Sequence, residues 1–345
     1  MKVLVTGGTG FVGSNVAEYY AKKGFKVTCI DNLSRGELLK KEISTVHNWT
    51  YLRKLKNIQL VKGDIRDSEK LKAISKEADI IIHTAAQTAV TTSLQDPRTD
   101  FEVNLLGTFN VLEAARLSNC NPVLIYCSTN KVYGNNVNKI KIKEKKIRYA
   151  FEDKFKNGIP ETFPIDLCEH TPYGCSKLAA DLYVQDYAHV YGLRSGVFRM
   201  SCIYGPHQFG VEDQGWIAWF IIATLLCHPI TIYGDGKQVR DVLYVSDLIN
   251  AYDSFVNSNI KQEVFNVGGG PSNILSLLEL LNMIEKFTGK RSKVRFANWR
   301  QSDQKVYVSN ITKINEKLNW KPETNPEEGI KELAEWLKRN KGKFE

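Results

Sequence analysis

The sequence predicts an α/β protein, with a doubly wound parallel sheet followed by a smaller, mixed α/β lobe. Two observations carry this prediction. Over the first two thirds of the chain, short runs rich in β-branched residues alternate with helical patterns, as in the right-handed βαβ units of a parallel sheet covered on both faces. A glycine-rich segment also follows the first of these runs directly, which is typical of the phosphate-binding turn of such sheets.

The expected elements follow one another in chain order. Strands are expected at 2–6, 26–31, 58–64, 79–85, 122–129 and 194–200, and helices at 13–23, 68–75, 101–118 and 173–191. Beyond Arg199 the pattern loosens into short runs at 229–236, 240–245, 264–270 and 293–296, a helix at 276–288, and a terminal helix capped by Asn325. We expect the runs within 240–248 and 264–268 to return to the parallel sheet.

These elements predict two domains. The first comprises 1–200 with 240–270, the second comprises 201–239 with 271–345, and a substrate is expected between the two lobes. With 345 residues, of which 43% are hydrophobic and 25% charged, the chain is long enough to bury a substantial core. It has the composition of an ordinary soluble globular protein.

Charge argues against a nucleic-acid partner. Much of the net charge of +9 lies in the segment 139–148 and in the tail 338–343, which we interpret as a solvated loop and a solvated terminus. No aromatic residues interleave the basic segment, as a base-stacking platform would require.

Cysteine usage predicts reduced thiols in a cytoplasmic protein without a bound metal. The seven cysteines are an odd number without paired CxxC spacing, which supports neither a disulfide framework nor a zinc site. The chain enters a strand at Lys2 without signal-peptide features, and its longest apolar run, 216–227, is shorter than a bilayer crossing needs. No membrane partner is expected.

The glycine-rich segment predicts a dinucleotide site. It contains overlapping GxGxxG and GxxGxxG patterns, formed by Gly7, Gly8, Gly10 and Gly13. Glycine allows a tight turn, brings backbone N–H groups close to a pyrophosphate and lets the next helix pack on the strand. The second strand ends in Asp31, whose carboxylate would bond an adenosine ribose and repel a 2′-phosphate, so NAD is favoured over NADP. Arg35 weakens this preference, because its guanidinium could accommodate the phosphate.

Residues at two further strand ends are candidates for the same site. Asp64 follows the third strand, and Ala85, Ala86 and Gln87 follow the fourth. Because ligands of parallel sheets bind at the carboxyl ends of the strands, we expect these residues to lie at the cofactor. We interpret His83, within the fourth strand, as a packed core histidine rather than a catalyst.

A tyrosine and a lysine four residues apart predict oxidation of an alcohol. The fifth strand ends at Ser128 and Thr129, and Tyr173 and Lys177 then share one face of a helix. An ammonium beside Tyr173 would lower its ordinary pKa of about 10 and favour the phenolate, which can act as a base. Thr129 can bond the substrate hydroxyl while hydride leaves its carbon for a nicotinamide.

These motifs resemble those of the extended short-chain dehydrogenases/reductases, the NAD-dependent epimerase/dehydratase family, whose members modify nucleotide sugars on a Rossmann sheet. The resemblance spans essentially the whole chain, through segments such as TGGTGFVG, GDIRD, HTAAQ, YGCSK and RDVLYVSDL. It implies tightly bound NAD in the first domain, a nucleotide sugar in the second, and Thr129, Tyr173 and Lys177 as the catalytic residues. The cofactor-binding residues that it implies are Gly7, Gly10, Phe11, Val12, Gly13, Asp31, Asn32, Ser34, Arg35, Asp64, Ile65, Ala85, Ala86, Gln87, Asn104, Tyr173 and Lys177. Support of the active-site loop is the alternative role for Asn104. The substrate-binding residues that it implies are Thr129, Asn130, Lys131, Gln208, Arg240, Arg300 and Asp303.

The residues after Thr129 narrow the reaction. In the dehydratase branch of the family an Asp-Glu pair follows the Ser-Thr and performs the acid/base steps of elimination, whereas here Asn130 and Lys131 stand at those positions. An amide does not titrate usefully and an ammonium cannot act as a base. Reversible oxidation and reduction remain, as in an epimerase.

The segments 128–134, 163–177, 213–220 and 302–304 are together similar to the CDP-paratose 2-epimerase (CDP-tyvelose epimerase) branch. That likeness implies removal of hydride from C2 of a 3,6-dideoxyhexose, a 2-keto intermediate, and return of hydride to the opposite face. Arg240 and Arg300 resemble the diphosphate-binding arginines of the family, and surface ion pairing is their alternative role. The family often carries Asn where this chain has Cys202, so the contact of this position with the sugar or the diphosphate stays open.

Two other functions stay open. A UDP-hexose or UDP-hexuronate 4-epimerase would use the same three catalytic residues at C4, and a non-catalytic NAD sensor would need only the cofactor site. The choice of nucleotide base and of carbon rests on the resemblance alone. The resemblance also implies a homodimer or homotetramer, formed through helices near 102–117 and 173–192.

Overall fold

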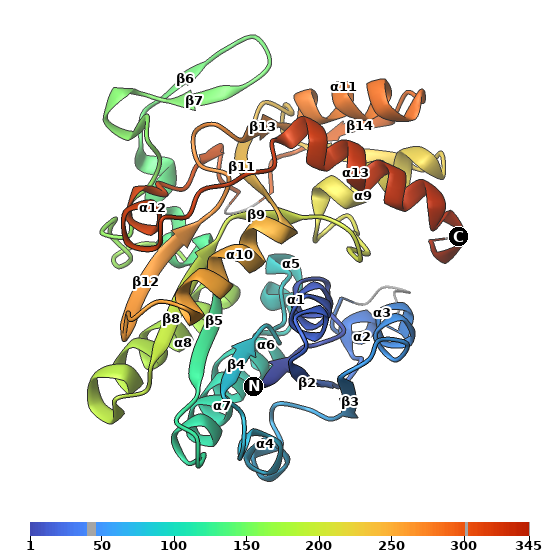
Figure 1. The fold of residues 1–345 in the computed structure, drawn as a ribbon. Helices are drawn as coiled ribbons and strands as arrows, with labels where there is room; N and C mark the ends of the chain where they lie inside the picture. Colours follow the sequence, from blue (N-terminus) through green and yellow to red (C-terminus); the bar gives the residue numbers. More distant parts are fainter. Residues whose placement is uncertain (40–45, 301–302, 345) are drawn as a thin grey trace. The chain divides into compact units, whose positions relative to one another are not determined.

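A seven-stranded sheet forms the centre of the first part of the chain. The computed structural model describes residues 1–39, 46–300 and 303–344, so Ser302 of the segment 302–304 lies outside the described residues. The strands run in the order β12-β8-β5-β4-β1-β2-β3 (Figure 1), and the pairings from β3 to β5 are all parallel. They are β1 Lys2–Thr6, β2 Lys26–Asp31, β3 Ile58–Lys62, β4 Ile80–His83, β5 Val123–Thr129, β8 Ser195–Met200 and β12 Gln262–Val267. The predicted doubly wound sheet is confirmed.

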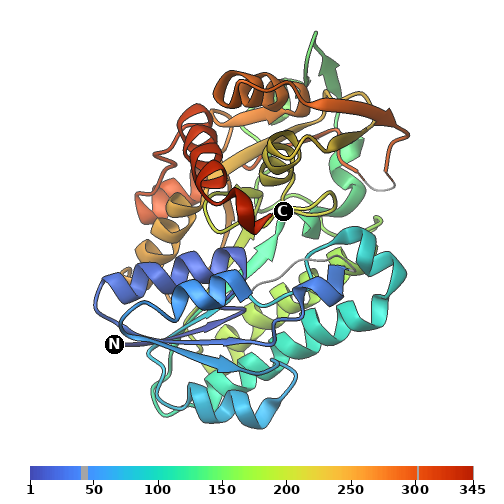
Figure 2. The same cartoon turned by 90° about the vertical axis from the view of Figure 1, so that its right-hand side faces the viewer.

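Apolar runs form the inner strands because both faces of the sheet are covered. β4 is buried at every position and β1 at all but its first, as expected for central parallel strands. α1 (Phe11–Lys22) lies on the face opposite α4 (Ser68–Ser75) and α7 (Gly107–Arg116) (Figures 1 and 2). On the latter face, α8 (Thr171–Tyr191) joins α4 and α7 in a core that includes Leu4, Leu71, Leu112, Leu124 and Val184.

The helix expected at 101–118 begins earlier and is divided, so that prediction is wrong at its start. After α5 (Val90–Gln95), α6 (Pro97–Phe101) begins with Asp96, whose side chain accepts a hydrogen bond from the Thr99 N–H. A π-helical turn, η1 (Glu102–Leu106), then leads into α7. Asp at the N-cap followed by Pro at the first position is a local start signal, and the apolar pattern alone does not contain it.

The second part of the chain holds smaller sheets, which confirms the predicted mixed lobe. β9 (Cys202–Tyr204), β11 (Val239–Tyr244), β13 (Ile274–Ser276) and β15 (Val306–Tyr307) form one mixed sheet, and β10 (Pro229–Tyr233) pairs with β14 (Lys293–Ala297). The helices α9 (Trp216–Leu225), α11 (Leu277–Thr288) and α13 (Pro326–Arg339) share a core with these strands. Asn325 caps α13 as predicted, by accepting a hydrogen bond from the Glu328 N–H.

Only one of the two runs expected to return to the parallel sheet does so. β12, which overlaps 264–268, is one of the seven strands, whereas β11, which overlaps 240–248, pairs with β9, β13 and β15. The expectation for 240–248 is therefore wrong. Both strands mix apolar with charged or amide residues and are largely buried, and such runs do not reveal which partner strand they will meet.

The basic segment 139–148 lies in a β-hairpin rather than in the expected loop. β6 (Ile142–Glu144) pairs antiparallel with β7 (Tyr149–Phe151), and the lysines at 141, 143, 145 and 146 are exposed. The segment is solvated as expected, but Lys and Ile alternate along it. This alternation suits a strand with one covered face, and Ile142 packs against Tyr149 and Val306.

The chain divides into two compact units. The first comprises Met1–Val132, Thr171–Arg199 and Ala251–Phe265, and the second comprises Tyr133–His170, Met200–Asn250 and Asn266–Glu345. This division differs from the expected domains, 1–200 with 240–270 and 201–239 with 271–345, chiefly in grouping 133–170 and 240–250 with the second unit. The ligands assigned to the two domains stay predictions.

The remaining helices complete the two parts of the chain. They are α2 (Arg35–Leu39), α3 (Val46–Leu52), η2 (Asn130–Lys139), η3 (Asp153–Phe155), α10 (Val245–Val256), α12 (Thr312–Leu318) and η4 (Lys341–Lys343). Within 1–39, 46–300 and 303–344, no helix has the length and hydropathy to cross a bilayer. Over the same ranges, no group of three or more His, Cys, Asp or Glu residues could hold a metal ion. All seven cysteines are free thiols.

Candidate active site

The glycine-rich turn between β1 and α1 leaves little room for side chains. Gly7 has a φ of +65°, and a Cβ there would lie 2.7 Å from the Cα of Ala85. A Cβ on Gly13 would collide with the carbonyl oxygen of Gly7, so only glycine lets α1 begin this close to the strand.

The start of α1 fits an anionic ligand. Gly10 is the N-cap, and in the part of the chain that the structure describes no side chain caps the helix. The first-turn N–H groups, including those of Phe11 and Val12, therefore face outward from a positive helix end, which suits a pyrophosphate.

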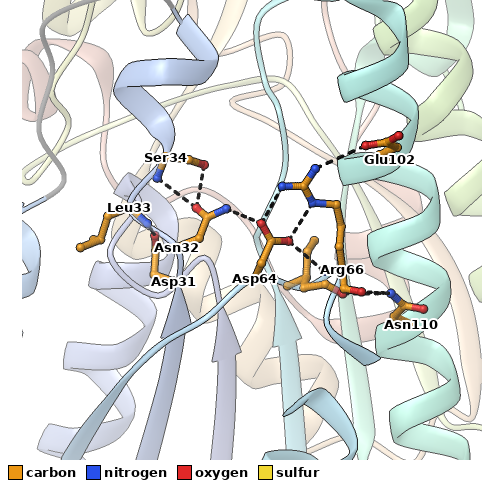
Figure 3. A network of polar contacts seen from close by, with 9 residues as sticks. Asp31, Asn32, Leu33, Ser34, Asp64, Arg66, Glu102 and Asn110 are labelled. Carbon is orange, nitrogen blue, oxygen red and sulfur yellow. Dashed lines mark hydrogen bonds and ion pairs between the residues drawn. The ribbon is translucent and has the colours of Figure 1, made fainter. Parts of the chain in front are cut away.

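The loop after β2 is held by its own side chains (Figure 3). Asp31 accepts hydrogen bonds from the Thr9 N–H at 3.0 Å and the Leu33 N–H at 2.8 Å. Asn32 accepts from both the N–H and the hydroxyl of Ser34, at 3.0 and 2.7 Å. These bonds stabilise Leu33 at its φ of +62°. The loop that carries the predicted ribose-binding carboxylate is thus preorganised.

Asp64, after β3, is held as an anion. Arg66 donates from Nε and Nη2 at 3.0 and 2.8 Å, and Asn32 donates at 2.8 Å (Figure 3). Burial opposes ionisation of this carboxyl, but the hydrogen bonds from Arg66 and Asn32 outweigh it and hold its pKa at about 2. The Asn32 bond ties the β2 and β3 ends together, and both residues belong to the predicted cofactor set.

Two other members of the cofactor set lie close to the same loops. Ile65 is buried and stands where a Cβ on Gly107 would meet it. Arg35 begins α2, and burial lowers the pKa of its guanidinium to about 10, which leaves it charged at neutral pH.

The loop after β4 is supported by Asn104 of the π-helical turn. Asn104 accepts from the Gln87 N–H at 2.8 Å and donates to the Gln87 carbonyl at 3.0 Å. Both side chains are only 1% exposed, so neither offers surface to a cofactor. Their geometry is that of residues that hold the loop with Ala85 and Ala86 in place, which is the alternative role expected for Asn104. Direct contact of either residue with the cofactor stays a prediction.

His83 is a core histidine, as predicted. Its ring is bonded to the hydroxyls of Thr6 at 2.6 Å and Thr108 at 2.9 Å. Burial, with the nearby Lys177 charge, lowers its pKa to about 3. It is therefore neutral over the physiological range.

Thr129, Tyr173 and Lys177 all lie in the first unit, at the end of β5 and in the first two turns of α8. The Lys177 ammonium donates to the Cys127 carbonyl at 2.6 Å and stands 4.3 Å from the centre of the Tyr126 ring. The Tyr173 backbone N–H donates to Ser93 of α5. Sequence reasoning missed Cys127 and Tyr126, because a backbone carbonyl and a ring face leave no motif.

The electrostatics of this group differ from the expectation. Burial raises the pKa of the Tyr173 phenol to about 12, although the Thr129 hydroxyl acts in the lowering direction. Burial also lowers the pKa of the Lys177 ammonium to about 8. The expected depression of the Tyr173 pKa by Lys177 is therefore not found, because loss of water around the phenol dominates.

The predicted substrate residues lie partly beside Thr129 and partly in the second unit. Asn130 is buried, and the Lys131 N–H donates to the Thr129 hydroxyl at 3.2 Å. In the second unit, Gln208 is 2% exposed and donates to the Ile203 carbonyl, so its side chain supports the local backbone.

Each predicted diphosphate arginine is paired with a carboxylate of the second unit. Arg240 bonds Asp303 at 2.7 Å, and Arg300 pairs with Asp213 at 3.1 Å while its guanidinium lies 3.9 Å from the centre of the Tyr233 ring. Cys202, which departs from the family pattern, accepts a hydrogen bond from the Trp216 indole at 3.4 Å. The ion pairs realise the alternative role foreseen for these arginines, and their role toward a diphosphate stays a proposal.

Known proteins match the chain over nearly its whole length. Residues 3–268 match the model of the NAD dependent epimerase/dehydratase family. The chain is 43% identical to CDP-paratose 2-epimerase of Salmonella typhi, over 97% of this chain and 99% of that protein. It is 31% identical to a putative UDP-glucose 4-epimerase of Methanocaldococcus jannaschii, over 98% and 99% of the two chains.

Solved structures share the fold over the whole length. UDP-glucose 4-epimerase of Thermotoga maritima, solved with UDP-glucose, superposes with a TM-score of 0.82 at 28% identity and covers 99% of each chain. UDP-glucose 4-epimerase of Thermus thermophilus, solved with NAD, gives a TM-score of 0.80 at 30% identity over 98% and 99%. Since the family model and full-length relatives agree, the chain belongs to the NAD-dependent epimerase/dehydratase family, the extended short-chain dehydrogenases/reductases, and is an NAD-dependent enzyme.

Proposed function

We propose that the chain is an NAD-dependent epimerase that converts CDP-paratose to CDP-tyvelose by inverting C2 of the sugar. The observation that carries this proposal is the 43% identity to the Salmonella typhi CDP-paratose 2-epimerase over almost the whole of both chains. The putative 4-epimerase of Methanocaldococcus jannaschii reaches 31%. The replacement of the dehydratase Asp-Glu pair by Asn130 and Lys131 supports epimerisation over elimination.

NAD fits the residues at the β1, β2 and β3 ends. The cradle at Gly7, Gly10 and Gly13 would hold the pyrophosphate against the start of α1, and the preorganised Asp31 would face the adenosine ribose. NAD, when bound, supplies the nicotinamide that takes up a hydride from C2 and returns it. A carboxylate at Asp31 supports NAD rather than NADP, and mass spectrometry of the cofactor that co-purifies would test this choice.

The chain's own residues would move the proton. Tyr173 would take the proton of the C2 hydroxyl and later return it, while the Thr129 hydroxyl orients that oxygen. A phenol with a pKa of about 12 is a poor base at neutral pH, so catalysis requires a positive charge near it when substrate binds. Lys177, with a pKa of about 8, is still largely protonated at pH 7 and can supply that charge.

Residues of the second unit would hold the nucleotide diphosphate. Arg240 and Arg300 offer planar, bidentate donors suited to phosphate oxygens. In this role they would exchange Asp303 and Asp213 for the more highly charged diphosphate. Asp303, Gln208 and Lys131 are the further substrate residues of the proposal.

Purified protein offered single nucleotide sugars tests this function. We expect CDP-paratose and CDP-tyvelose to interconvert without added NAD, because the two hydride transfers cancel and the cofactor stays bound. The products are separated by chromatography and assigned by NMR. Turnover of UDP-glucose or UDP-glucuronate alone would overturn the C2 and CDP assignments.

A UDP-hexose or UDP-hexuronate 4-epimerase is the second candidate. It is favoured by the 31% identity to UDP-glucuronate 4-epimerase of Thermodesulfobacterium geofontis over 98% of this chain and by the likeness to the Thermotoga structure. A non-catalytic NAD sensor is the third, and the grouping of Thr129, Tyr173 and Lys177 argues against it.

We further propose a homodimer or homotetramer in the cytoplasm. Large apolar side chains are exposed on the helices α6, α7 and α8, namely Phe101, Phe109, Leu182, Tyr183 and Val190. Exposed apolar surface of this kind marks protein interfaces, and two of the rings, Phe109 and Tyr183, already pack edge to face. The free state of all seven thiols supports a reducing compartment.

A further inference from the structure

A buried ion pair lies directly behind the end of β5. Asp181 of α8 accepts from Nε and Nη2 of Arg199, on β8, at 3.0 and 3.1 Å. The Ser128 hydroxyl donates to the same carboxylate at 2.6 Å, and Gln185 donates at 2.7 Å. Asp181 is completely buried, and the Arg199 side chain is 5% exposed. The carboxylate is therefore fully satisfied.

Stability alone is a weak reason for such a pair. Moving two charges out of water costs most of what their attraction returns, and apolar pairs of similar volume are often as stable. What the pair provides is geometry, because a planar guanidinium that bonds both carboxylate oxygens fixes direction as well as distance. Hydrogen bonds from β5, β8 and α8 itself fix the position of the Asp181 carboxylate.

Those three elements are the ones that carry the proposed catalytic residues or border them. Ser128 directly precedes Thr129 on β5. Asp181 lies one helical turn beyond Lys177 on α8, and residues four apart lie on the same helix face. The bond from Ser128 to Asp181 thus joins the helix of Tyr173 and Lys177 to the strand of Thr129. The hydrogen bond from Lys177 to the Cys127 carbonyl is a second link between α8 and β5.

The charge of Asp181 also favours the protonated form of Lys177. The Asp181 carboxylate raises the pKa of Lys177 against the lowering effect of burial. The other groups that face this ammonium are Cys127 and Tyr126 of β5, Asp100 of α6, and the neutral His83 of β4. Of these, only Asp100 is a second carboxylate.

We propose that Asp181 is a positioning residue for epimerisation, which acts through Ser128 and Arg199 to hold α8 in register with the end of β5. This inference rests on the proposed catalytic roles of Thr129, Tyr173 and Lys177. It assigns Ser128 a task distinct from that of Thr129, since Ser128 faces the ion pair rather than the substrate.

Two substitutions in the full-length protein test the proposal on CDP-paratose. Ser128→Ala removes the hydrogen bond that links Asp181 to β5 and leaves the Asp181–Arg199 ion pair intact. We expect kcat to fall about tenfold to a hundredfold with KM nearly unchanged, because small displacements of reacting groups cost this much. Ser128→Thr, which restores a hydroxyl, should recover most of that rate.

Asp181→Asn should lower kcat further and move the basic limb of the kcat/KM profile down by about one pH unit, since one opposing charge beside Lys177 is lost. Asp247→Asn is the matched control, because Asp247 is also a buried carboxylate, 2% exposed and bonded to the Thr324 N–H, but lies in the second unit. We expect it to lower Tm and leave the shape of the pH profile unchanged.

Wild-type kcat and pH profile in folded Ser128→Ala and Asp181→Asn proteins would overturn the inference. If Asp181→Asn does not fold, the comparison of Ser128→Ala with Ser128→Thr decides it, and equal rates in those two count against it. Failure of the wild-type chain to convert CDP-paratose would instead overturn the proposed function. The same variants are then scored on whichever UDP sugar the wild type converts.

Discussion

At the residue scale, burial sets the protonation of the candidate catalytic group. The same loss of water raises the pKa of Tyr173 and lowers that of Lys177, because it disfavours the charged form of each. Asp64 shows the opposite outcome, since Arg66 and Asn32 satisfy its charge. Hydrogen bonds therefore keep the Asp64 carboxylate ionised, whereas burial keeps the Tyr173 phenol neutral.

Replacement of Tyr173 by Phe should abolish most of the activity. The variant lacks the hydroxyl that would take and return the substrate proton, and a positioned acid/base group contributes about a hundredfold to ten-thousandfold in rate. Turnover of CDP-paratose is the measurement, and bound NAD and the circular dichroism spectrum should match the wild type. Unchanged turnover would favour another base.

The reaction rate should fall as pH rises through about 8. Lys177 has its pKa lowered to about 8, and its protonated form is the one that stabilises a neighbouring phenolate. Loss of that proton above this pH removes the positive charge and therefore the stabilisation. The kcat/KM profile checks this, with the fold verified at each pH. A profile that stays level from pH 7 to about 9.5 would contradict the role of Lys177.

At the element scale, local signals account for the segments that were predicted well. The Gly-rich turn, the N-cap at Asn325 and the alternation of strands and helices are all read from neighbouring residues. The start of α6 at Asp96 and Pro97 was also a local signal. The apolar period alone places the helix start later, because the capping residues Asp96 and Pro97 lie outside that period.

Substitution of Gly13 by Ala should disturb both α1 and the cofactor site. The added Cβ would meet the backbone of Gly7, which cannot move aside as a flexible side chain could, so we expect a loss of about 1–3 kcal/mol in unfolding free energy and weaker NAD binding. Thermal unfolding and a fluorescence titration with NAD measure the two effects. Gly342→Ala is the control, because a Cβ there has no heavy atom within 4 Å among the described residues. Equal behaviour of the two variants would contradict the steric account.

At the scale of the whole molecule, pairing between distant segments decides what local patterns leave open. β11 and β12 are both largely buried strands of mixed composition, yet they join different sheets. The hairpin at 139–148 also depends on pairing. Its alternating Lys and Ile residues form a strand because β7 pairs with β6 and apolar residues cover one side. Segment 133–170 groups with the second unit although it follows β5 directly in the chain.

The assembly should depend on the exposed apolar side chains of α7 and α8. Tyr183 is 43% exposed and packs edge to face with Phe109, so Tyr183→Glu would place a charge in the proposed interface and favour monomers. Sedimentation equilibrium measures the mass. Phe296→Glu, at a 61% exposed position of β14, serves as the control and should leave the assembly intact. A wild-type protein that sediments as a monomer would exclude the interface.

Local sequence patterns are enough to predict the parallel sheet, the glycine turn and the candidate residues Asp31, Thr129, Tyr173 and Lys177. They are enough because backbone freedom, helix caps and side-chain periodicity act between neighbours along the chain. Three features follow from the folded chain instead. Asn104 and Gln87 hold each other in a loop, Lys177 is bound to the Cys127 carbonyl, and burial raises the Tyr173 pKa, opposite to the lowering expected from Lys177. These outcomes depend on which distant groups exclude water and supply hydrogen bonds, and no local pattern carries that information.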